Sequence, residues 1–372
     1  MTGSSGGTRR GPWAIAVLLL LVLASFTAVA CGDDDDDGGS SDKSSSADSG
    51  GSGGGEKVKI GVSNTLVGNG WREEMICAVK AQALASGNVS EVAVHNINGG
   101  APEQIAGIRN LISAGVKAII INPADREALN PVIKEADRRG IVVVAVDQAV
   151  SAPEAYVVTN DQVAYGRVGA EWLAEQLGGK GKVVEMRGIE GVPADEDRHQ
   201  GFTEALKKYP DIDVTKETFT GWQFANGGKQ ALDILNSGEQ VDGIWTSGID
   251  YTVVNALKTA GKDYVPVVGA DTNEFLNQML TLEKDGFVGG AVTNPATIGG
   301  VGTRIALDAL AGEEPEKKTL LKPEVWDVKE DKETIEGFYD KSLPPTYSSQ
   351  MTVEPYTTYK PEQLKACKGP GE

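Results

Sequence analysis

The chain has few of the residues from which metal and nucleophile sites are built. Its 372 residues include two histidines, His95 and His199, and three cysteines, Cys31, Cys77 and Cys367. This set leaves no Cys/His cluster for zinc and no Cys–His pair for covalent catalysis. We therefore expect no metal site, no cofactor and no catalytic nucleophile.

Positive charge is also scarce. Lys and Arg together number 35 against 53 Asp and Glu, which gives a formal net charge of −18. A surface this acidic repels phosphate backbones, so nucleic acid is not an expected partner. The same surface gives no electrostatic help to an anionic ligand.

Long apolar runs are confined to residues 13–24, which follow Arg9 and Arg10 and lead into small residues that end at Cys31. The run is too short, and wrongly flanked, for a membrane-spanning helix, and it predicts a secretory signal over residues 1–30. A Cys directly after the small residues resembles the signal of bacterial lipoproteins, although Ala28 stands where that family prefers Leu. The resemblance implies a lipid anchor on Cys31 and a place at the outer, extracytoplasmic face of a cell membrane. The alternative is an ordinary signal peptide.

Residues 31–56 contain a run of five aspartates and then mostly Ser and Gly, with no apolar residue larger than Ala47. Such a segment cannot bury a core, and it predicts a disordered, acidic tether. A calcium site is the alternative for the aspartates, but their spacing is not that of a calcium loop.

From residue 57 onward, short β-branched runs alternate with helical periodicity. Strands are expected at 57–62, 92–94, 118–121, 141–146 and 156–158, and in a second series at 183–186, 214–219, 243–246, 267–269 and 287–292. Helices are expected at 71–85, around Ile105 to Leu111, at 128–136, 204–208 and 253–259. Continuous apolar strands separated by helices predict an α/β protein with two doubly wound parallel-sheet lobes. Ligands bind such sheets at the carboxyl ends of the strands.

The residues just after the predicted strands are mainly amides, carboxylates, arginines and tryptophans. Carboxylates and amides can hold paired hydroxyl groups, a guanidinium donates a planar fork of hydrogen bonds, and indoles cover apolar ring faces. This is the chemistry needed to hold a polyhydroxylated ring.

With these residues in place, the chain resembles the type I periplasmic sugar-binding proteins, the ribose- and galactose-binding group that serves ABC importers. The matching stretches are 119–125, 141–147, 198–202, 256–261 and 268–271, and their order and spacing carry the resemblance. It implies two lobes joined by a hinge of three crossing strands near Asn160, Asn294 and Lys322. The implied lobes are 57–160 plus 294–322, and 161–293 plus 323–372.

The resemblance also implies a set of ligand-binding residues, taken position by position. They are Asn69, Trp71, Arg72, Asn122, Asp147, Gln148, Arg198, Trp222, Asp250, Asp271 and Asn294. Arg72 stands where a second aromatic residue is usual, and Gln148 where an arginine is usual, so the ligand need not be ribose.

Several of these residues have simpler interpretations that the sequence leaves open. Asn122 could end its strand before Pro123, and Asp147 and Asp271 could cap helices. Trp71 could belong to the core, and Arg198 to a surface ion pair.

Cys77 and Cys367 are the two cysteines of the predicted folded part. In an exported domain we expect them to be paired. Two separate thiols are the alternative.

The leading interpretation is a monomeric binding protein that captures a sugar or polyol between its lobes and delivers it to the permease of an ABC importer. The alternative is the ligand-binding part of a chemosensory or sensor-kinase system, including one for furanose-type signal molecules. Glycosidic chemistry by two Asp and an Arg is a third interpretation. A repressor of similar core is excluded, because an export signal stands where its helix-turn-helix would be.

Overall fold

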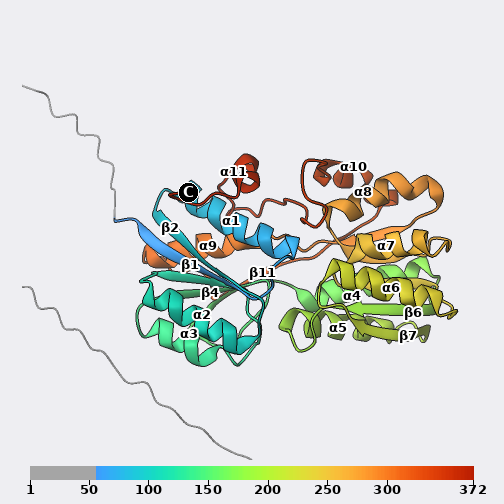
Figure 1. Cartoon of the computed structure of the whole chain (residues 1–372), viewed down its shortest axis with the longest axis horizontal. Coiled ribbons are helices and arrows are strands. Elements are labelled where there is room, and N and C mark those ends of the chain that lie inside the picture. Colours follow the sequence, from blue (N-terminus) through green and yellow to red (C-terminus); the bar gives the residue numbers. More distant parts are fainter. Residues whose placement is uncertain (1–55) are drawn as a thin grey trace, which may run out of the picture. The chain divides into compact units, whose positions relative to one another are not determined.

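The computed structural model describes residues 56–372 (Figure 1). The predicted signal peptide, most of the tether and Cys31 lie outside the described residues. Among residues 56–372, no helix has the length and apolar character needed to cross a bilayer.

The described residues form two lobes. The N-terminal lobe contains β1 (Val58–Asn64), α1 (Gly70–Ser86), β2 (Val89–Asn96), α2 (Ala101–Ser113), β3 (Ala118–Ile121), α3 (Asn130–Asp137), β4 (Val142–Val146), β5 (Tyr156–Asn160), α9 (Ile298–Leu310) and β11 (Lys318–Leu321). The C-terminal lobe contains α4 (Gln162–Gln176), β6 (Lys180–Arg187), α5 (Pro193–Leu206), β7 (Asp211–Phe219), α6 (Phe224–Asn236), β8 (Gly243–Thr246), α7 (Asp250–Thr259), β9 (Val267–Ala270), α8 (Asn273–Leu282), a 3-10 turn (Glu283–Asp285), β10 (Gly289–Val292), β12 (Val325–Trp326) and α10 (Val328–Phe338).

Each lobe is built on a six-stranded sheet. The strand orders are β11-β5-β4-β3-β1-β2 and β12-β10-β9-β8-β6-β7. All pairs are parallel except β10 with the short β12. The predicted α/β fold with two doubly wound parallel-sheet lobes is confirmed.

Helices cover both faces of each sheet, and alternate residues of a strand enter opposite cores. In β3, Ala118 and Ile120 pack with α1 and α9, whereas Ile119 and Ile121 pack with α2 and α3. All four are fully buried. This double burial explains why the strands read as continuous apolar runs.

Most predicted elements are present, with shifted ends. The clearest correction is the helix expected at 204–208, which is the last part of α5, a helix that begins at Pro193. Proline is favoured at the first helical position. The buried residues Ala194, Arg198, Phe202 and Ala205 follow a helical spacing. Charged residues between them hid this period in the sequence.

The chain crosses between the lobes after β5, after β10 and after β11, near the three positions implied by the resemblance. The crossings are joined to each other by hydrogen bonds: Asn160 Nδ2 donates to Thr293 O at 2.9 Å and to Asn294 Oδ1 at 3.1 Å. The Thr293 amide donates to Glu324 O at 2.8 Å, and the Asp161 amide to Leu321 O at 2.9 Å.

The expectation that residues 323–372 all belong to the C-terminal lobe needs a correction. After α10 the chain returns to the N-terminal lobe, where α11 (Pro361–Ala366) packs on α1 (Figure 1). Gln82 of α1 holds this segment by donating to Thr358 Oγ1 at 2.7 Å and accepting from the Thr358 amide at 3.1 Å. We call residues 339–372 the C-terminal tail, and it forms a fourth connection between the lobes.

Cys77 of α1 and Cys367 of the tail form a disulfide, with their Cα atoms 4.5 Å apart. The two residues are separated by 290 positions, so the bond encloses nearly all of the described chain. Around it, Ala78, Tyr359 and Leu364 form a small buried cluster. The bond therefore fixes the end of the tail to the first helix.

We predict that removing this disulfide lowers the stability of the folded chain. A loop of this size gives about 4–5 kcal/mol in the chain-entropy model, although measured values often fall short. Cys77→Ala/Cys367→Ala should therefore unfold at lower denaturant concentration than the parent. Mass spectrometry of the non-reduced parent should show the loss of two thiol hydrogens. Two free thiols in the exported protein would contradict the pairing.

Candidate ligand-binding site

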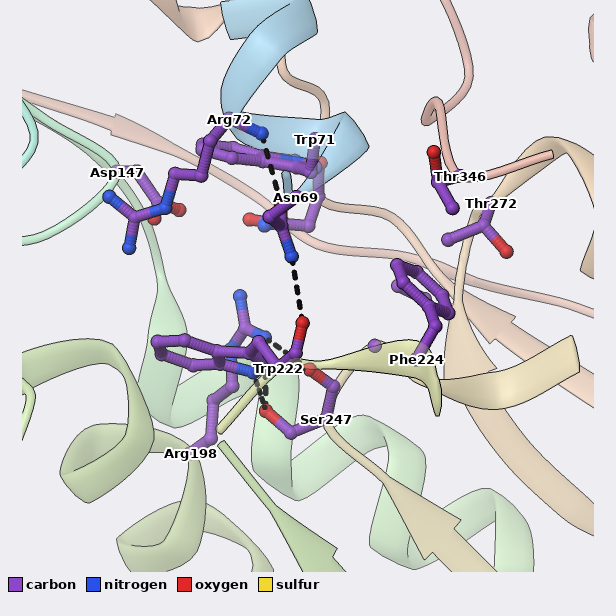
Figure 2. Close-up of a pocket in the computed structure, with 13 residues that line it drawn as sticks. Asn69, Trp71, Arg72, Asp147, Arg198, Trp222, Phe224, Ser247, Thr272 and Thr346 are labelled. Carbon is purple, nitrogen blue, oxygen red and sulfur yellow. Dashed lines mark hydrogen bonds between the residues drawn. The ribbon is translucent and has the colours of Figure 1, made fainter. Parts of the chain in front are cut away.

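A pocket lies where the carboxyl ends of strands from both lobes meet (Figure 2). Its walls combine aromatic, charged and small polar side chains. The lining residues are Asn69, Trp71, Arg72, Asp147, Arg198, Trp222, Phe224, Ser247, Gly248, Ala270, Thr272, Asn294 and Thr346.

Two indoles, one from each lobe, lie on opposite sides of this pocket (Figure 2). Trp71, at the start of α1, donates from Nε1 to Asn294 O at 2.6 Å. Trp222, in the turn between β7 and α6, donates from Nε1 to Ser247 O at 2.7 Å. With their polar atoms bonded to the protein, both rings offer apolar surface to a ligand.

Charged side chains gather at one end of the pocket. Gln162, the first residue of α4, donates from Nε2 to Asp147 Oδ1 at 2.9 Å, and its Oε1 accepts from Arg198 Nε at 2.8 Å. The Arg198 guanidinium also lies 4.0 Å from the centre of the Tyr165 ring. One amide thus links the carboxylate of the N-terminal lobe to the guanidinium of the C-terminal lobe.

Arg72 is the second cation of the pocket. It is 4% exposed, and its Nη1 donates to Asn64 Oδ1 at 3.2 Å. Burial lowers the pKa of Arg72 to about 10, with Asp147 raising the pKa and Arg198 lowering it. The group remains charged at neutral pH and keeps donors available for ligand hydroxyl groups.

Two pocket residues have unusual backbone conformations. Asp147 has φ 66° and Trp222 has φ 51°, and both are in the left-handed region that residues other than glycine rarely adopt. Such conformations persist where the surroundings hold them and are common at functional sites. Thr159 Oγ1 donates to Asp147 O at 2.6 Å, and the Trp222 amide donates to Thr220 Oγ1 at 3.2 Å.

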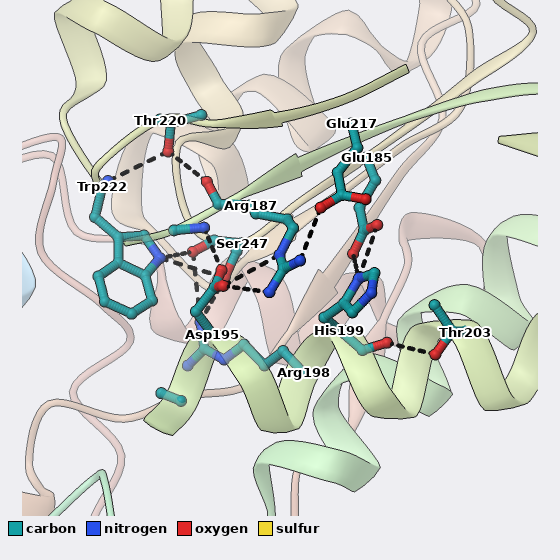
Figure 3. A network of polar contacts seen from close by, with 12 residues as sticks. Glu185, Arg187, Asp195, Arg198, His199, Thr203, Glu217, Thr220, Trp222 and Ser247 are labelled. Atoms are coloured by element: carbon teal, nitrogen blue, oxygen red, sulfur yellow. Dashed lines mark hydrogen bonds and ion pairs between the residues drawn. The ribbon is translucent and has the colours of Figure 1, made fainter. Parts of the chain in front are cut away.

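A polar network behind Trp222 fixes that wall of the pocket (Figure 3). Arg187 contacts Asp195 at 2.6 Å and Glu217 at 2.7 Å. Asp195 also accepts from the Gly188 amide at 2.6 Å. Gly188 lies directly beneath the indole, since a Cβ at this position would come within 2.1 Å of Trp222 Cε2.

The same network includes Glu185, His199 and Glu217, whose ligand atoms lie close enough together to hold a metal ion. These groups already have partners. His199 Nδ1 lies 2.9 Å from Glu185 Oε1, and Glu217 pairs with Arg187. Burial raises the pKa of Glu185 to about 7. We interpret the cluster as a hydrogen-bonded network that supports β6, β7 and α5.

The lobes contact each other around the pocket. Asn69, which caps α1 through its Oδ1, donates from Nδ2 to Trp222 O at 3.0 Å. Arg126 lies 2.8 Å from Asp197, and Gln148 Oε1 accepts from the Ala194 amide at 3.1 Å. The structure therefore has the lobes closed on the pocket.

Four of the predicted ligand-binding residues do not line the pocket. Asn122 and Gln148 bond to each other at 2.5 Å behind Asp147. Asp250 accepts from the Ala270 amide at 2.9 Å and the Tyr251 amide at 2.8 Å, and also from Thr272 Oγ1. Asp271 accepts from the Asn294 amide at 3.0 Å and from Ser349 Oγ. Burial raises the pKa of both aspartates to about 6. These side chains position their neighbours.

The other seven predicted residues, Asn69, Trp71, Arg72, Asp147, Arg198, Trp222 and Asn294, do line it. Arg198 is 4% exposed, so it does not form a surface ion pair.

Six residues that line the pocket were not among the predicted ligand-binding residues. Ser247, Gly248, Ala270 and Thr272 end or follow strands β8 and β9, where the strand-end rule points. Phe224 and Thr346 do not follow a predicted strand directly, so this rule could not identify them.

The fold and pocket agree with comparisons to known proteins. The model of the periplasmic binding protein domain family matches residues 60–314. The chain belongs to this family. Among curated relatives, the "Xylitol-binding protein" of Mycolicibacterium smegmatis is 30% identical over 234 residues, 62% of this chain and 66% of the relative. The "Galactofuranose-binding protein YtfQ" of Escherichia coli is 26% identical over 293 residues, 74% of this chain and 90% of the relative.

Solved structures of other solute-binding proteins share the fold of this periplasmic binding protein. An ABC transporter solute binding protein from Thermobispora bispora is 28% identical with a TM-score of 0.71, covering 83% of this chain and 94% of that one. The binding protein of an arabinose ABC transporter from Shewanella is 25% identical with a TM-score of 0.68, covering 75% and 95%. The chain thus belongs to an extracytoplasmic family, and its relatives are sugar- and polyol-binding proteins rather than enzymes.

We predict that Gly188→Ala displaces Trp222, because the added Cβ has no room beside the indole. With 5-fluorotryptophan incorporated, the ¹⁹F resonance of Trp222, assigned through Trp222→Phe, should shift markedly. Gly337→Ala is the matched control: nothing lies within 4 Å of its Cβ position on α10, so the resonance should stay in place. An unchanged resonance in Gly188→Ala would contradict the close packing.

Proposed function

We propose that this protein captures a neutral pentose- or hexose-sized sugar or polyol between its lobes and delivers it to the permease of an ABC importer. The observation that carries the proposal is the pair of indoles from opposite lobes beside Asp147, Arg72 and Arg198 (Figure 2). A ligand with one apolar face on each side and hydroxyl groups at its edge fits this arrangement.

The charged groups suit hydroxyl groups rather than a fully charged ligand. Asp147 accepts hydrogen bonds, whereas Arg72 and Arg198 donate them, so together they can satisfy both functions of vicinal hydroxyls. All three are nearly fully buried, with exposures of 4% each. Hydrogen bonds to buried charged groups are strong and directional.

The relatives support the same ligand class. Their names state xylitol and galactofuranose as ligands, and a further relative, 27% identical, is the "Ribose import binding protein RbsB" of Salmonella typhimurium. The Shewanella structure holds L-arabinofuranose. Polyols, pyranoses and furanoses therefore all belong in the first screen. The transport role and an importer permease as partner are inferred from the relatives whose names mention import.

We predict that a cognate ligand raises the melting temperature and compacts the protein. A ligand that binds only the folded state stabilises it by about 2.7 kcal/mol at a hundredfold excess over Kd. Asp147→Ala and Arg198→Ala each remove a charged hydrogen-bond partner, which costs about 1.5–3 kcal/mol, or at least about a tenfold loss of affinity. Calorimetry and small-angle scattering measure the two effects.

Asp233→Ala and Arg109→Ala serve as matched controls, because both side chains are exposed and neither lines the pocket. They should bind and compact as the parent does. Normal binding and compaction by both pocket variants would refute the proposed site.

We also propose that Cys31 carries the lipid anchor, on the strength of its position after the signal. Cys31→Ser, produced with its signal in a bacterial host, should move from the membrane fraction to the soluble extracytoplasmic fraction. Stable retention needs more than one acyl chain, so a high-salt wash should not release the parent. Membrane retention of the Ser variant after the same wash would count against the anchor.

A further inference from the structure

The C-terminal tail lies beyond the segment that matches the family, which ends at residue 314. It nevertheless passes close to the pocket on its way from one lobe to the other. It leaves the C-terminal lobe at Asn273 of α8, whose Nδ2 donates to Asp340 O at 2.9 Å. It reaches the N-terminal lobe at Thr297, whose Oγ1 donates to Met351 O at 2.7 Å.

Between these points, two consecutive serines bind carboxylates of opposite lobes. The Ser348 amide donates to Glu74 Oε2 of α1 at 2.7 Å, and its hydroxyl donates to the same oxygen at 3.1 Å. The Ser349 hydroxyl donates to Asp271, and its amide donates to Asp271 O at 2.9 Å. Glu74 and Asp271 are both fully buried. The tail is therefore held firmly at the hinge by both lobes.

This anchorage brings Thr346 into the wall of the pocket. Thr346 packs against Gly70, the first residue of α1. A Cβ at Gly70 would come within 1.9 Å of Thr346 Oγ1 and 2.9 Å of Thr346 O. The tail thus occupies the space that a side chain on α1 would need, which gives a reason for glycine at this position.

Thr346 lies with Thr272 and Phe224 at the end of the pocket away from Arg72 and Asp147 (Figure 2). Phe224 is fixed by stacking on Tyr251, with ring centres 4.9 Å apart. A ligand whose hydroxyl groups bind the charged end extends toward this opposite end. The three side chains there limit how far it can extend.

We propose that Thr346 of the tail is a specificity-determining residue, which sets the length of ligand that the pocket accepts. This inference rests on the proposed function. It adds that part of the selectivity comes from a segment outside the family's matched region, held in place by Ser348, Ser349 and the Cys77–Cys367 disulfide.

The test compares homologous ligands that differ by one carbon: xylitol with sorbitol, and ribose with allose. Calorimetry gives the Kd ratio within each pair for the parent, Thr346→Ala and Thr346→Leu. One carbon unit in a confined pocket changes affinity by about tenfold or more. Thr346→Ala should shift the ratio toward the longer ligand, and Thr346→Leu should shift it toward the shorter one, each by about tenfold.

Two further variants complete the design. Thr352→Leu places the same residue at an exposed position of the tail and should leave both ratios unchanged. Gly70→Ala forces Thr346 to move, because the added Cβ would lie 1.9 Å from Thr346 Oγ1, and it should therefore change both ratios. It therefore tests the wall even if Leu at 346 prevents folding.

The outcomes separate the two proposals. If the parent binds and Thr346→Ala and Gly70→Ala leave the ratios unchanged, the inference about the tail fails and the proposed function stands. If the parent binds none of the pentoses, hexoses and polyols of the first screen, the proposed ligand class fails, and the inference fails with it; a ligand from that screen other than these four is paired with its own one-carbon homologue in the same test.

Discussion

The side-chain amide of Gln162 is the interaction on which the pocket depends. A buried carboxylate and a buried guanidinium each need a partner, or their desolvation is not offset. Gln162 supplies one to both, accepting from Arg198 and donating to Asp147. Because a neutral amide joins them, neither charge is cancelled by a direct ion pair, and both keep free hydrogen-bonding capacity. Gln162 is also the first residue of α4 and lies directly after the first crossing between the lobes. The same residue therefore lies at the hinge and holds Asp147 and Arg198 in position.

The residues that line the pocket are held in place by hydrogen-bonded residues behind them. The Trp222 indole packs against Gly188. The Gly188 amide donates to Asp195, and Asp195 forms an ion pair with Arg187. Asn122 donates to Asp147 and accepts from Gln148. Gln148 in turn accepts from the Ala194 amide of the opposite lobe. Side chains that contact a ligand are thus supported by a second layer whose rotamers are set by hydrogen bonds. This arrangement reduces the conformational entropy that ligand binding must offset.

The sequence predicted the inner strands of both sheets, because strands buried on both faces leave continuous apolar runs. It missed the edge strands β11 and β12, which are short and lack such a run. It predicted the pocket in part, because strand ends converge in any parallel sheet. It could not separate side chains that face the ligand from those that bind backbone. Asp250 and Asp271 illustrate this limit, since their carboxylates accept amide hydrogens from Ala270 and Asn294. The path of the tail was also missed, because its contacts are hydrogen bonds from single residues and a short helix, without any apolar period.

The order of segments along the chain has a consequence for how the protein matures. Neither lobe is continuous: α9 and β11, which complete the N-terminal lobe, come after the whole of the first C-terminal series. The disulfide joins Cys367 of the C-terminal tail to Cys77 of α1. The N-terminal lobe therefore cannot be completed until α9 and β11 have been made, after nearly all of the C-terminal lobe. Until Cys367 follows them, Cys77 on α1 has no partner, so the disulfide can form only after the strands of both lobes have been made.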